Sequence, residues 1–241
     1  MKKILMSVLL VSLWIMGLST FAQEVPEEII SNSLYSQSKD IINGTKWVYE
    51  KKYRGIPYLV GNNWAIVNVN YNGKPFKGVS LNYNLFTDEF IIFVSEKENK
   101  KYVVLSKDFL ESFSYKDTLV NKDRFFEYFQ LPDTKEKRLY EVTYKGKSLF
   151  LIRHTKVVRS KIADGFLGDY ISSVDLYIKV DDKFEAFSNK KDLLLILGKH
   201  TQEFKKFIRK NKFKINKWHF ENITPLIEYF DELEALAFSQ N

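Results

Sequence analysis

Residues 64–76 read WAIVNVNYNGKPF, and this stretch decides the fold. Apolar and polar side chains alternate from Val67 to Tyr71, and a period of two residues is typical of a half-buried β-strand. The pair Asn72-Gly73 then predicts a two-residue hairpin turn, because both residues tolerate a positive φ. Pro75 has no backbone N–H to donate, so we expect it near the start or the edge of the returning strand.

The same alternation recurs on both sides of this stretch, between Thr45 and Phe187. We expect strands at 45–53, 64–71, 81–85, 90–94, 102–105, 111–115, 124–130, 139–144, 148–158, 174–180 and 183–187. Short links such as Lys145-Gly146 and Asp181-Asp182 join them, and links of this length suit hairpins. Neighbouring parallel strands would need a helix between them, and no helical pattern precedes Ser188. The pattern therefore predicts an antiparallel sheet.

The period changes at Ser188, after which three helical segments follow. Residues 190–197 and 203–210 carry apolar side chains at helical spacing, and so does the stretch 223–233. Ser188 is the expected N-cap of the first helix, and Gly198 marks its expected end. We therefore predict an α+β fold: a curved antiparallel β meander or half-barrel, followed by a C-terminal helical segment that packs on it.

The first 22 residues have the pattern of an export signal. A lysine pair at 2–3 precedes an apolar run at 4–17, and Thr20 and Ala22 occupy the small-residue positions of a cleavage site. We expect this leader to be removed and the protein to be periplasmic or extracellular. The expected organisation is a signal peptide at 1–22, a lead-in segment at 23–44, an antiparallel β-rich body at 45–187 and C-terminal helices at 188–241.

The composition is that of a globular protein without cross-links. Hydrophobic residues make up 45% of the 241 residues and charged residues 28%, with 10 Gly, 5 Pro and no Cys. These values exclude a collagen-like, a low-complexity and a disulfide-stapled chain. All three methionines lie in the expected leader, so the exported chain would contain no sulfur for thiol chemistry or for cysteine–metal sites.

Residues that carry catalysis or bind metals are sparse. His154, His200 and His219 have no metal-ligand spacing, and the sequence holds no nucleophile elbow, Walker A loop or dinucleotide fingerprint. The loop 164–169 offers two carboxylates, fewer oxygen ligands than calcium requires, so we expect an exposed strand connection there. We therefore assign no catalytic residue, no metal ligand and no cofactor.

Charge is segregated near the C-terminus. Seven basic residues and no acid lie between positions 205 and 217: Lys205, Lys206, Arg209, Lys210, Lys212, Lys214 and Lys217. Residues 218–241 carry five acids and no Lys or Arg. The basic stretch predicts contact with an anionic partner, such as lipid headgroups, acidic glycan or an envelope protein, and nucleic acid is a poor partner for an exported chain. The alternative is that the two segments are neighbours, with the basic one facing the acidic helix and solvent.

Turn and strand motifs in the first half of the chain have a characteristic spacing. They are Asn43-Gly44, Trp47-Val48-Tyr49, Gly55-Ile56-Pro57-Tyr58, Trp64, residues 69–73, Val79, residues 81–85 and Asp88. With this spacing the chain resembles a group of uncharacterised exported β-rich proteins of the Bacteroidota. The resemblance implies a β-rich body with a helical C-terminal end, and it carries over no activity and no catalytic residue.

One short motif suggests a modification. Asp117-Thr118-Leu119 matches the acidic–hydroxyl–aliphatic acceptor for O-glycosylation in exported proteins of the Bacteroidota. Thr118 is therefore a candidate glycosylation site.

Three functions remain open from the sequence. An export leader and a well-patterned core without a recognisable site favour a non-catalytic binding or scaffolding protein of the cell envelope. The first alternative is an envelope-glycan hydrolase that uses a pair of carboxylates. The second is a lipid or lipoprotein carrier whose curved sheet wraps an acyl chain in an apolar groove between sheet and helices.

Overall fold

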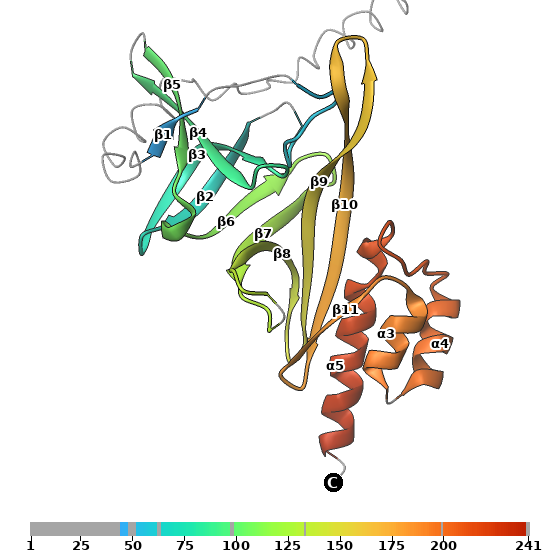
Figure 1. Ribbon diagram of the computed structural model, residues 1–241. Helices are drawn as coiled ribbons and strands as arrows, with labels where there is room; N and C mark the ends of the chain where they lie inside the picture. Colours follow the sequence, from blue (N-terminus) through green and yellow to red (C-terminus); the bar gives the residue numbers. More distant parts are fainter. Residues whose placement is uncertain are drawn as a thin grey trace, which may run out of the picture.

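The computed structural model describes residues 44–47, 52–61, 64–96, 99–132, 134–198 and 200–239. The expected signal peptide and all of the lead-in segment except Gly44 lie outside the described residues. The described chain forms one sheet of eleven strands followed by three α-helices, so the α+β class is confirmed (Figure 1). Among the described residues no helix is both long and apolar enough to span a bilayer.

The elements follow one another in a simple order. The strands are β1 (Gly44–Lys46), β2 (Ala65–Tyr71), β3 (Lys74–Asn84), β4 (Glu89–Glu96), β5 (Asn99–Leu105), β6 (Leu110–Asp117), β7 (Lys122–Phe129), β8 (Arg138–Lys145), β9 (Leu149–Ala163), β10 (Phe166–Val180) and β11 (Lys183–Phe187). The helices are α3 (Lys190–Leu197), α4 (Thr201–Lys210) and α5 (Thr224–Ser239), with short 3₁₀ turns η2 (Lys107–Phe109) and η3 (Phe220–Asn222).

The strand pairs of the sheet are all antiparallel, in the order β1-β5-β4-β3-β2-β6-β7-β8-β9-β10-β11. Strand β2 lies inside this order, and its side chains alternate strictly between buried and exposed. Asn72 and Gly73 turn the chain into β3 with φ angles of 52° and 71°, so the predicted hairpin is confirmed. Pro75 lies next to the start of β3, as expected.

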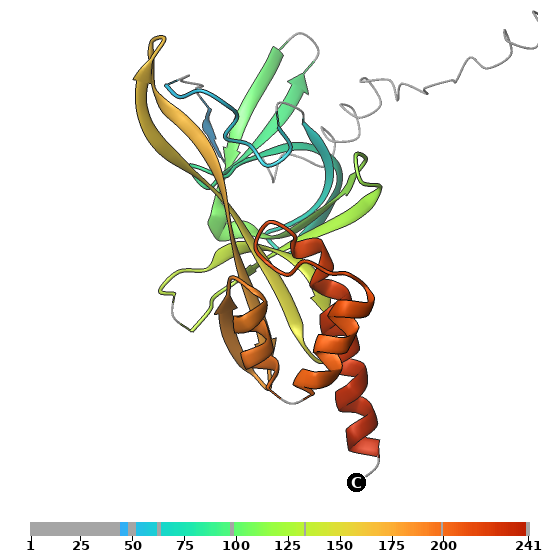
Figure 2. The same cartoon turned by 90° about the vertical axis from the view of Figure 1, so that its right-hand side faces the viewer.

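The sheet curls strongly in its first half. Residues 106–109 connect β5 to β6, although β4, β3 and β2 lie between these strands in the sheet. Four strand spacings on a flat sheet measure about 19 Å, whereas a link of this length reaches at most about 17 Å. The sheet therefore has to curl, as Figure 2 shows. Gly78 provides a corner within β3, because its φ of 68° is a conformation that other residues rarely adopt.

We call the curled part, from β2 to β7 with the loop after β7 (residues 65–137), the barrel part, and the first core that it encloses the barrel core. Phe90 on β4 lies 5.8 Å from the Phe113 ring on β6 and 6.2 Å from Tyr128 on β7, across the interior. Phe113 also stacks on Phe126 at 4.7 Å between ring centroids. Phe90, Phe113 and Phe126 are fully buried, so aromatic packing fills this interior.

A second core, the helix core, lies where α3, α4 and α5 cover one face of β9, β10 and β11 (Figure 1). Phe150, Ile152, Leu176 and Ile178 point from the sheet into this core, and all four are fully buried. Their helix partners include Leu193 on α3, Phe204 on α4, and Leu226 and Ile227 on α5. The predicted packing of the C-terminal helices on the sheet is therefore observed.

Helix α5 is also fixed by hydrogen bonds. The Asp231 carboxylate accepts from the Tyr144 hydroxyl at 2.9 Å and from the Ser148 N–H and hydroxyl at 2.9 and 2.7 Å. Tyr144 and Ser148 flank the turn between β8 and β9. Burial and the neighbouring Asp231 raise the pKa of Tyr144 to about 12.

The structure corrects several sequence predictions. The N-cap of α3 is Asn189, whose side chain accepts from the N–H groups of Lys191 and Asp192, and Ser188 instead donates to Asp192. The described residues of the strand predicted at 45–53 hold only β1, which ends at Lys46. For the start of α3, Ser188 and Asn189 are both good N-cap residues, so the sequence alone does not decide between them.

The segment 52–61 forms a strap across the sheet rather than a strand. Arg54 exchanges backbone hydrogen bonds with Gly168 and Tyr170 on β10, and Leu59 donates to Tyr83 on β3. The strap therefore joins two distant parts of the curled sheet. The sequence does not reveal this path, because the aromatic residues at 47–58 and the nearby Gly55 and Pro57 say nothing about contacts with distant strands.

Candidate functional site

The outer face of α4 is the most strongly charged surface that the sequence singled out. Phe204 and Ile208 face the helix core and are buried. At 100° per residue, Lys205, Arg209, Lys206 and Lys210 span an arc of about 140° on the opposite side. All four are exposed. We call these four residues the cation stripe.

The cation stripe points away from the rest of the protein. Phe204 packs against Phe230 and Tyr229 of α5, and Phe207 stacks on Tyr229 at 4.5 Å. Because α4 presents its apolar face to α5, its charged face is directed to solvent, at the outside of the helix layer (Figure 1). The chain continues the basic surface beyond the helix with exposed Lys212 and Lys214.

Lys217 and Trp218 end this basic segment. The Lys217 ammonium lies 5.0 Å from the centroid of the Trp218 ring, a cation–π contact. Trp218 is 61% exposed, which is unusual for the largest side chain. The end of the segment thus combines a cation with an exposed aromatic ring.

None of the seven predicted basic residues forms an ion pair with a residue in the described ranges. Two acidic residues of α5 have other partners: Asp231 holds the β8–β9 turn, and Glu234 lies 3.6 Å from the Lys147 ammonium and 3.4 Å from the His200 ring nitrogen. The two segments belong to packed neighbouring helices, but ion pairs between them do not neutralise the basic one. The stripe is therefore available to a partner.

A separate cleft of about 1100 Å³ lies at the end of the barrel core, far along the chain from the stripe. The β3–β4 turn, η2, the facing parts of β6 and β7 and the loop after β7 line it, with Asp88, Lys107, Asp108, Leu110, Glu111, Ser112, Phe125, Glu127, Tyr128, Gln130, Lys135, Glu136 and Lys137. The lining is mixed in charge, with carboxylates and lysines close together.

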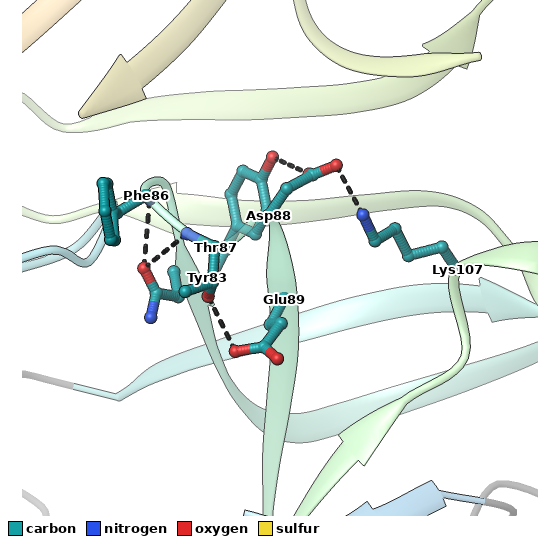
Figure 3. A network of polar contacts seen from close by, with 7 residues as sticks. Tyr83, Phe86, Thr87, Asp88, Glu89 and Lys107 are labelled. Atoms are coloured by element: carbon teal, nitrogen blue, oxygen red, sulfur yellow. Dashed lines mark hydrogen bonds and ion pairs between the residues drawn. The ribbon is translucent and has the colours of Figure 1, made fainter. Parts of the chain in front are cut away.

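Asp88 is a carboxylate of the cleft that accepts from two side chains of the protein (Figure 3). It accepts from the Tyr83 hydroxyl at 2.5 Å and from the Lys107 ammonium at 2.7 Å. The turn that carries it is held by the Asn84 side chain, which accepts from the N–H groups of Phe86 and Thr87. Burial is the main cause that raises the pKa of Tyr83 well above its ordinary value, and the negative charge of Asp88 is the next largest. This phenol is therefore a hydrogen-bond donor at neutral pH.

Other carboxylates of the cleft are also held by donors of the protein. Glu111 accepts from the Gly73 N–H at 2.7 Å, and Glu127 lies 3.2 Å from the Lys145 ammonium. Such groups orient a polar ligand by hydrogen bonds. Their positions come from loops and strand ends that are distant in sequence, which is why the sequence did not reveal this cleft.

A row of charged side chains, half-buried except for the buried Glu141, crosses four strands between the two cores. Asp117 on β6 pairs with Arg124 on β7 at 2.9 Å, Arg124 pairs with Glu141 on β8 at 3.2 Å, and Glu141 lies 2.6 Å from the ring nitrogen of His154 on β9. The His154 ring also contacts Phe126 of the barrel core and Phe220 of η3.

Glu141 is the most buried member of this row, with its side chain 4% exposed. Burial alone would raise the pKa of its carboxyl group, but the hydrogen bond to His154 and the charges of His154 and Arg124 outweigh burial and lower it. The sequence placed His154 in a strand without finding its partner, because pairing across strands depends on register. The signal that could have found this pair is the position of Glu141 between the apolar side chains of Tyr140 and Val142 in β8.

The three histidines do not come together. His154 belongs to the row of charges, His200 precedes α4 near Glu234, and His219 lies 3.1 Å from the Asn216 side-chain oxygen. No group of three His, Cys, Asp or Glu side chains within the described ranges is arranged to hold a metal ion.

Thr118 and Asp164 lie on turns, whereas residues 166–169 of the connection predicted at 164–169 belong to the start of β10. Thr118 is exposed in the turn between β6 and β7, where Asp117 accepts from the Leu119 N–H. Asp164 lies at the exposed tip of the β9–β10 hairpin, and with Asp169 it holds the Arg54 guanidinium of the strap at 3.0 and 2.8 Å. The loop 164–169 therefore uses its carboxylates within the protein.

Comparisons with known proteins found no family model, no curated protein and no solved structure that matches this chain.

Proposed function

We propose that this protein is an exported, non-catalytic binding or scaffolding protein of the cell envelope, periplasmic or extracellular, of the kind that the Bacteroidota resemblance implies. The observation that carries the proposal is the basic segment 205–217, whose seven cations lack an ion-pair partner among the described residues. A folded protein gains little from keeping so many like charges together, since their mutual repulsion is unfavourable. Binding of an external anionic partner would offset this repulsion between the seven cations.

The packing of the interior also supports recognition at the outer surface. Fully buried aromatic rings fill the barrel core, and apolar side chains from both layers fill the helix core. The place where an acyl chain would lie, between sheet and helices, is occupied by residues such as Phe150, Phe187 and Phe204. The carrier hypothesis therefore ranks behind binding at the surface.

Fractionation of the native host tests the proposal. The protein is expected in the envelope or exported fraction with its leader removed, and a wash with about 1 M salt should release it from isolated envelopes, because the screening length falls to about 3 Å. Retention in the cytoplasm, or envelopes that never bind the purified protein at low salt, would contradict the proposal.

A second candidate function is hydrolysis of envelope glycans. It is favoured by the cleft beside the barrel core, which brings the carboxylates of Asp88, Glu111 and Glu127 to one lining. Incubation of the protein with envelope glycans should then release reducing ends, and Asp88→Asn and Glu127→Gln should each abolish that release. Release that survives both substitutions, or no release at all, would remove this candidate.

Modification at Thr118 is a further part of the proposal. The side chain lies in an exposed turn, as a glycan acceptor requires. The protein from its native host should exceed its sequence mass by a glycan, and Thr118→Ala should remove the excess. An unmodified native mass would dismiss the site.

A further inference from the structure

We infer that the basic segment of the helix layer docks on the surface of a bilayer rich in anionic phospholipid, with the cation stripe of α4 against the headgroups. The inference rests on the proposed function and names its partner. Four features carry it: the kind of cation, the shape of the surface, its exposed aromatic ring and the distribution of charge over the molecule.

The cations are suited to a diffuse array of phosphates. Six of the seven basic residues are lysines, and only Arg209 is an arginine. An arginine binds one phosphate or carboxylate with two parallel hydrogen bonds, whereas a lysine acts as a mobile point charge. A set dominated by lysines therefore fits many exchangeable headgroups better than a single ligand in a fixed geometry.

The surface is convex. The stripe lies on the side of α4 opposite the face that packs against α5, and α4 is at the outside of the helix layer (Figure 1). The cleft is lined by residues of the barrel part instead. A convex helix face can approach a flat bilayer without hindrance. Its long side chains then reach the headgroups, and laterally mobile anionic lipids can gather beneath them. The charge of each lysine or arginine near such a surface then adds to binding.

The segment also ends in an exposed aromatic side chain. Trp218 is 61% exposed and lies in contact with the Lys217 ammonium. Tryptophan favours the boundary between lipid and water, because its ring is apolar and its N–H can stay hydrated. A soluble acidic polymer offers no comparable apolar layer to such a ring.

The opposite charges lie elsewhere in the helix layer. Exposed acids are carried by η3 and α5, at Glu221, Glu228 and Glu232, whereas the solvent side of α4 carries the four cations of the stripe and one exposed acid, Glu203 in its first turn. A negative surface attracts the first face less than the second, so the charge distribution orients the molecule. The barrel part lies at the other end of the β9–β10 hairpin (Figure 1), so docking through α4 leaves its cleft clear of the bilayer.

Sedimentation with vesicles tests the inference on the full protein without its leader. One set of vesicles is phosphatidylcholine alone, and the other contains about 30% phosphatidylglycerol, which gives a negative surface potential. The protein should bind only the anionic vesicles, and binding should weaken at least about tenfold between 0.05 and 0.5 M salt as screening increases.

Two variants with the same loss of charge locate the binding surface. K205Q/K206Q/R209Q/K210Q removes the stripe, and K77Q/K116Q/K135Q/K137Q removes four exposed lysines of the barrel part. The first should lower the partition coefficient by about two to three orders of magnitude, and the second by less than about threefold. Circular dichroism and thermal unfolding should show both variants folded, since all eight sites are exposed. At the four sites on α4, glutamine is also a good helix former.

The outcomes separate this inference from the proposed function. Equal losses in both variants, or binding to zwitterionic vesicles, would overturn it. A protein that binds isolated envelopes or a soluble acidic polysaccharide but not anionic vesicles would also overturn it while leaving the proposed function intact. A protein that binds none of the three would contradict both.

Discussion

The sheet with its connections and the helix layer use their charged residues differently. In the sheet and its connections, Lys107 holds Asp88, Arg124 holds Asp117 and Glu141, and Arg54 holds Asp169. In the helix layer, the cations of α4 are left to solvent while the helices are held by apolar contacts and by Asp231. The comparison teaches that charge serves the fold in the first region and is free to serve recognition in the second.

The largest effect is expected in the barrel core. Phe113→Ala removes a fully buried ring that packs against Phe90 and Phe126 and leaves a cavity. We expect a loss of about 3–5 kcal/mol in the free energy of unfolding, measured by urea denaturation. Leu195→Ala, on an 80% exposed side chain of α3, is the control and should change it by less than about 0.5 kcal/mol. Similar values for both would contradict the described core.

The row of charges is the next test. Glu141→Ala leaves Arg124 and His154 without their shared carboxylate, at a cost of about 3–5 kcal/mol because a buried charge loses its partner. Glu141→Gln keeps the shape and should cost less, since the amide oxygen still accepts a hydrogen bond. Unfolding in urea at pH 7 measures both, and an unchanged alanine variant would show that the row does not support the fold.

The row also predicts a pH dependence. The pKa of Glu141 is lower in the folded protein than its ordinary value of 4.5, so its contribution is full above that value. It is lost as pH falls through the folded pKa, because protonation then favours the unfolded chain. The stability difference between the native protein and Glu141→Gln should therefore shrink below about pH 4.5. A difference that stays constant from pH 7 to pH 3 would exclude this linkage.

A smaller effect is expected where α5 meets the sheet. Asp231→Asn removes the charge that receives the Tyr144 hydroxyl and the two Ser148 donors, at a cost of about 1–3 kcal/mol. Loss of the neighbouring charge should also return the pKa of Tyr144 from about 12 part of the way to 10. Ultraviolet titration of the phenol follows this change, with Tyr144→Phe identifying the signal. An unchanged Tyr144 pKa would contradict the contact.

The smallest effect is expected at the first hairpin. An alanine Cβ at Gly73 meets no atom within 4 Å, so only its φ of 71° opposes the substitution. Gly73→Ala should lower the free energy of unfolding by about 1–2 kcal/mol, measured by thermal or urea unfolding. Lys74→Ala, at the exposed next position, is a control for loss of the side chain at the turn. A neutral Gly73→Ala would mean that the turn does not require the left-handed conformation.

The sequence predicted the parts of the fold that depend on neighbouring residues. Alternation from Val67 to Tyr71, the turn at Asn72-Gly73 and the link at Asp181-Asp182 are all observed, because period and turn chemistry are local. The full length of the β9–β10 hairpin was underestimated. Apart from the buried Gly168, the residues of its outer part with a described burial are half-buried or exposed, so no regular alternation marks these ends of the two strands.

What the sequence did not predict depends on distant pairing. The curl follows from the connection at 106–109, and its consequence appears only when the strand order is known. The strap at Arg54, the partner of His154 and the cleft around Asp88 each bring together residues from several strands. The cation stripe was found because helical spacing is local. That it forms no ion pair with any residue that the structure describes follows only from the arrangement of α4 and α5.

Lysine footprinting on envelopes tests the central claim most directly. The protein is acetylated in solution and when bound to isolated native envelopes, and mass spectrometry compares the modification of each lysine. Lys205, Lys206, Lys210 and Lys212 should be shielded severalfold by binding, whereas Lys77, Lys116 and Lys135 of the barrel part should react as in solution. Shielding confined to the barrel part, or equal reactivity of both sets in the bound protein, would contradict the account.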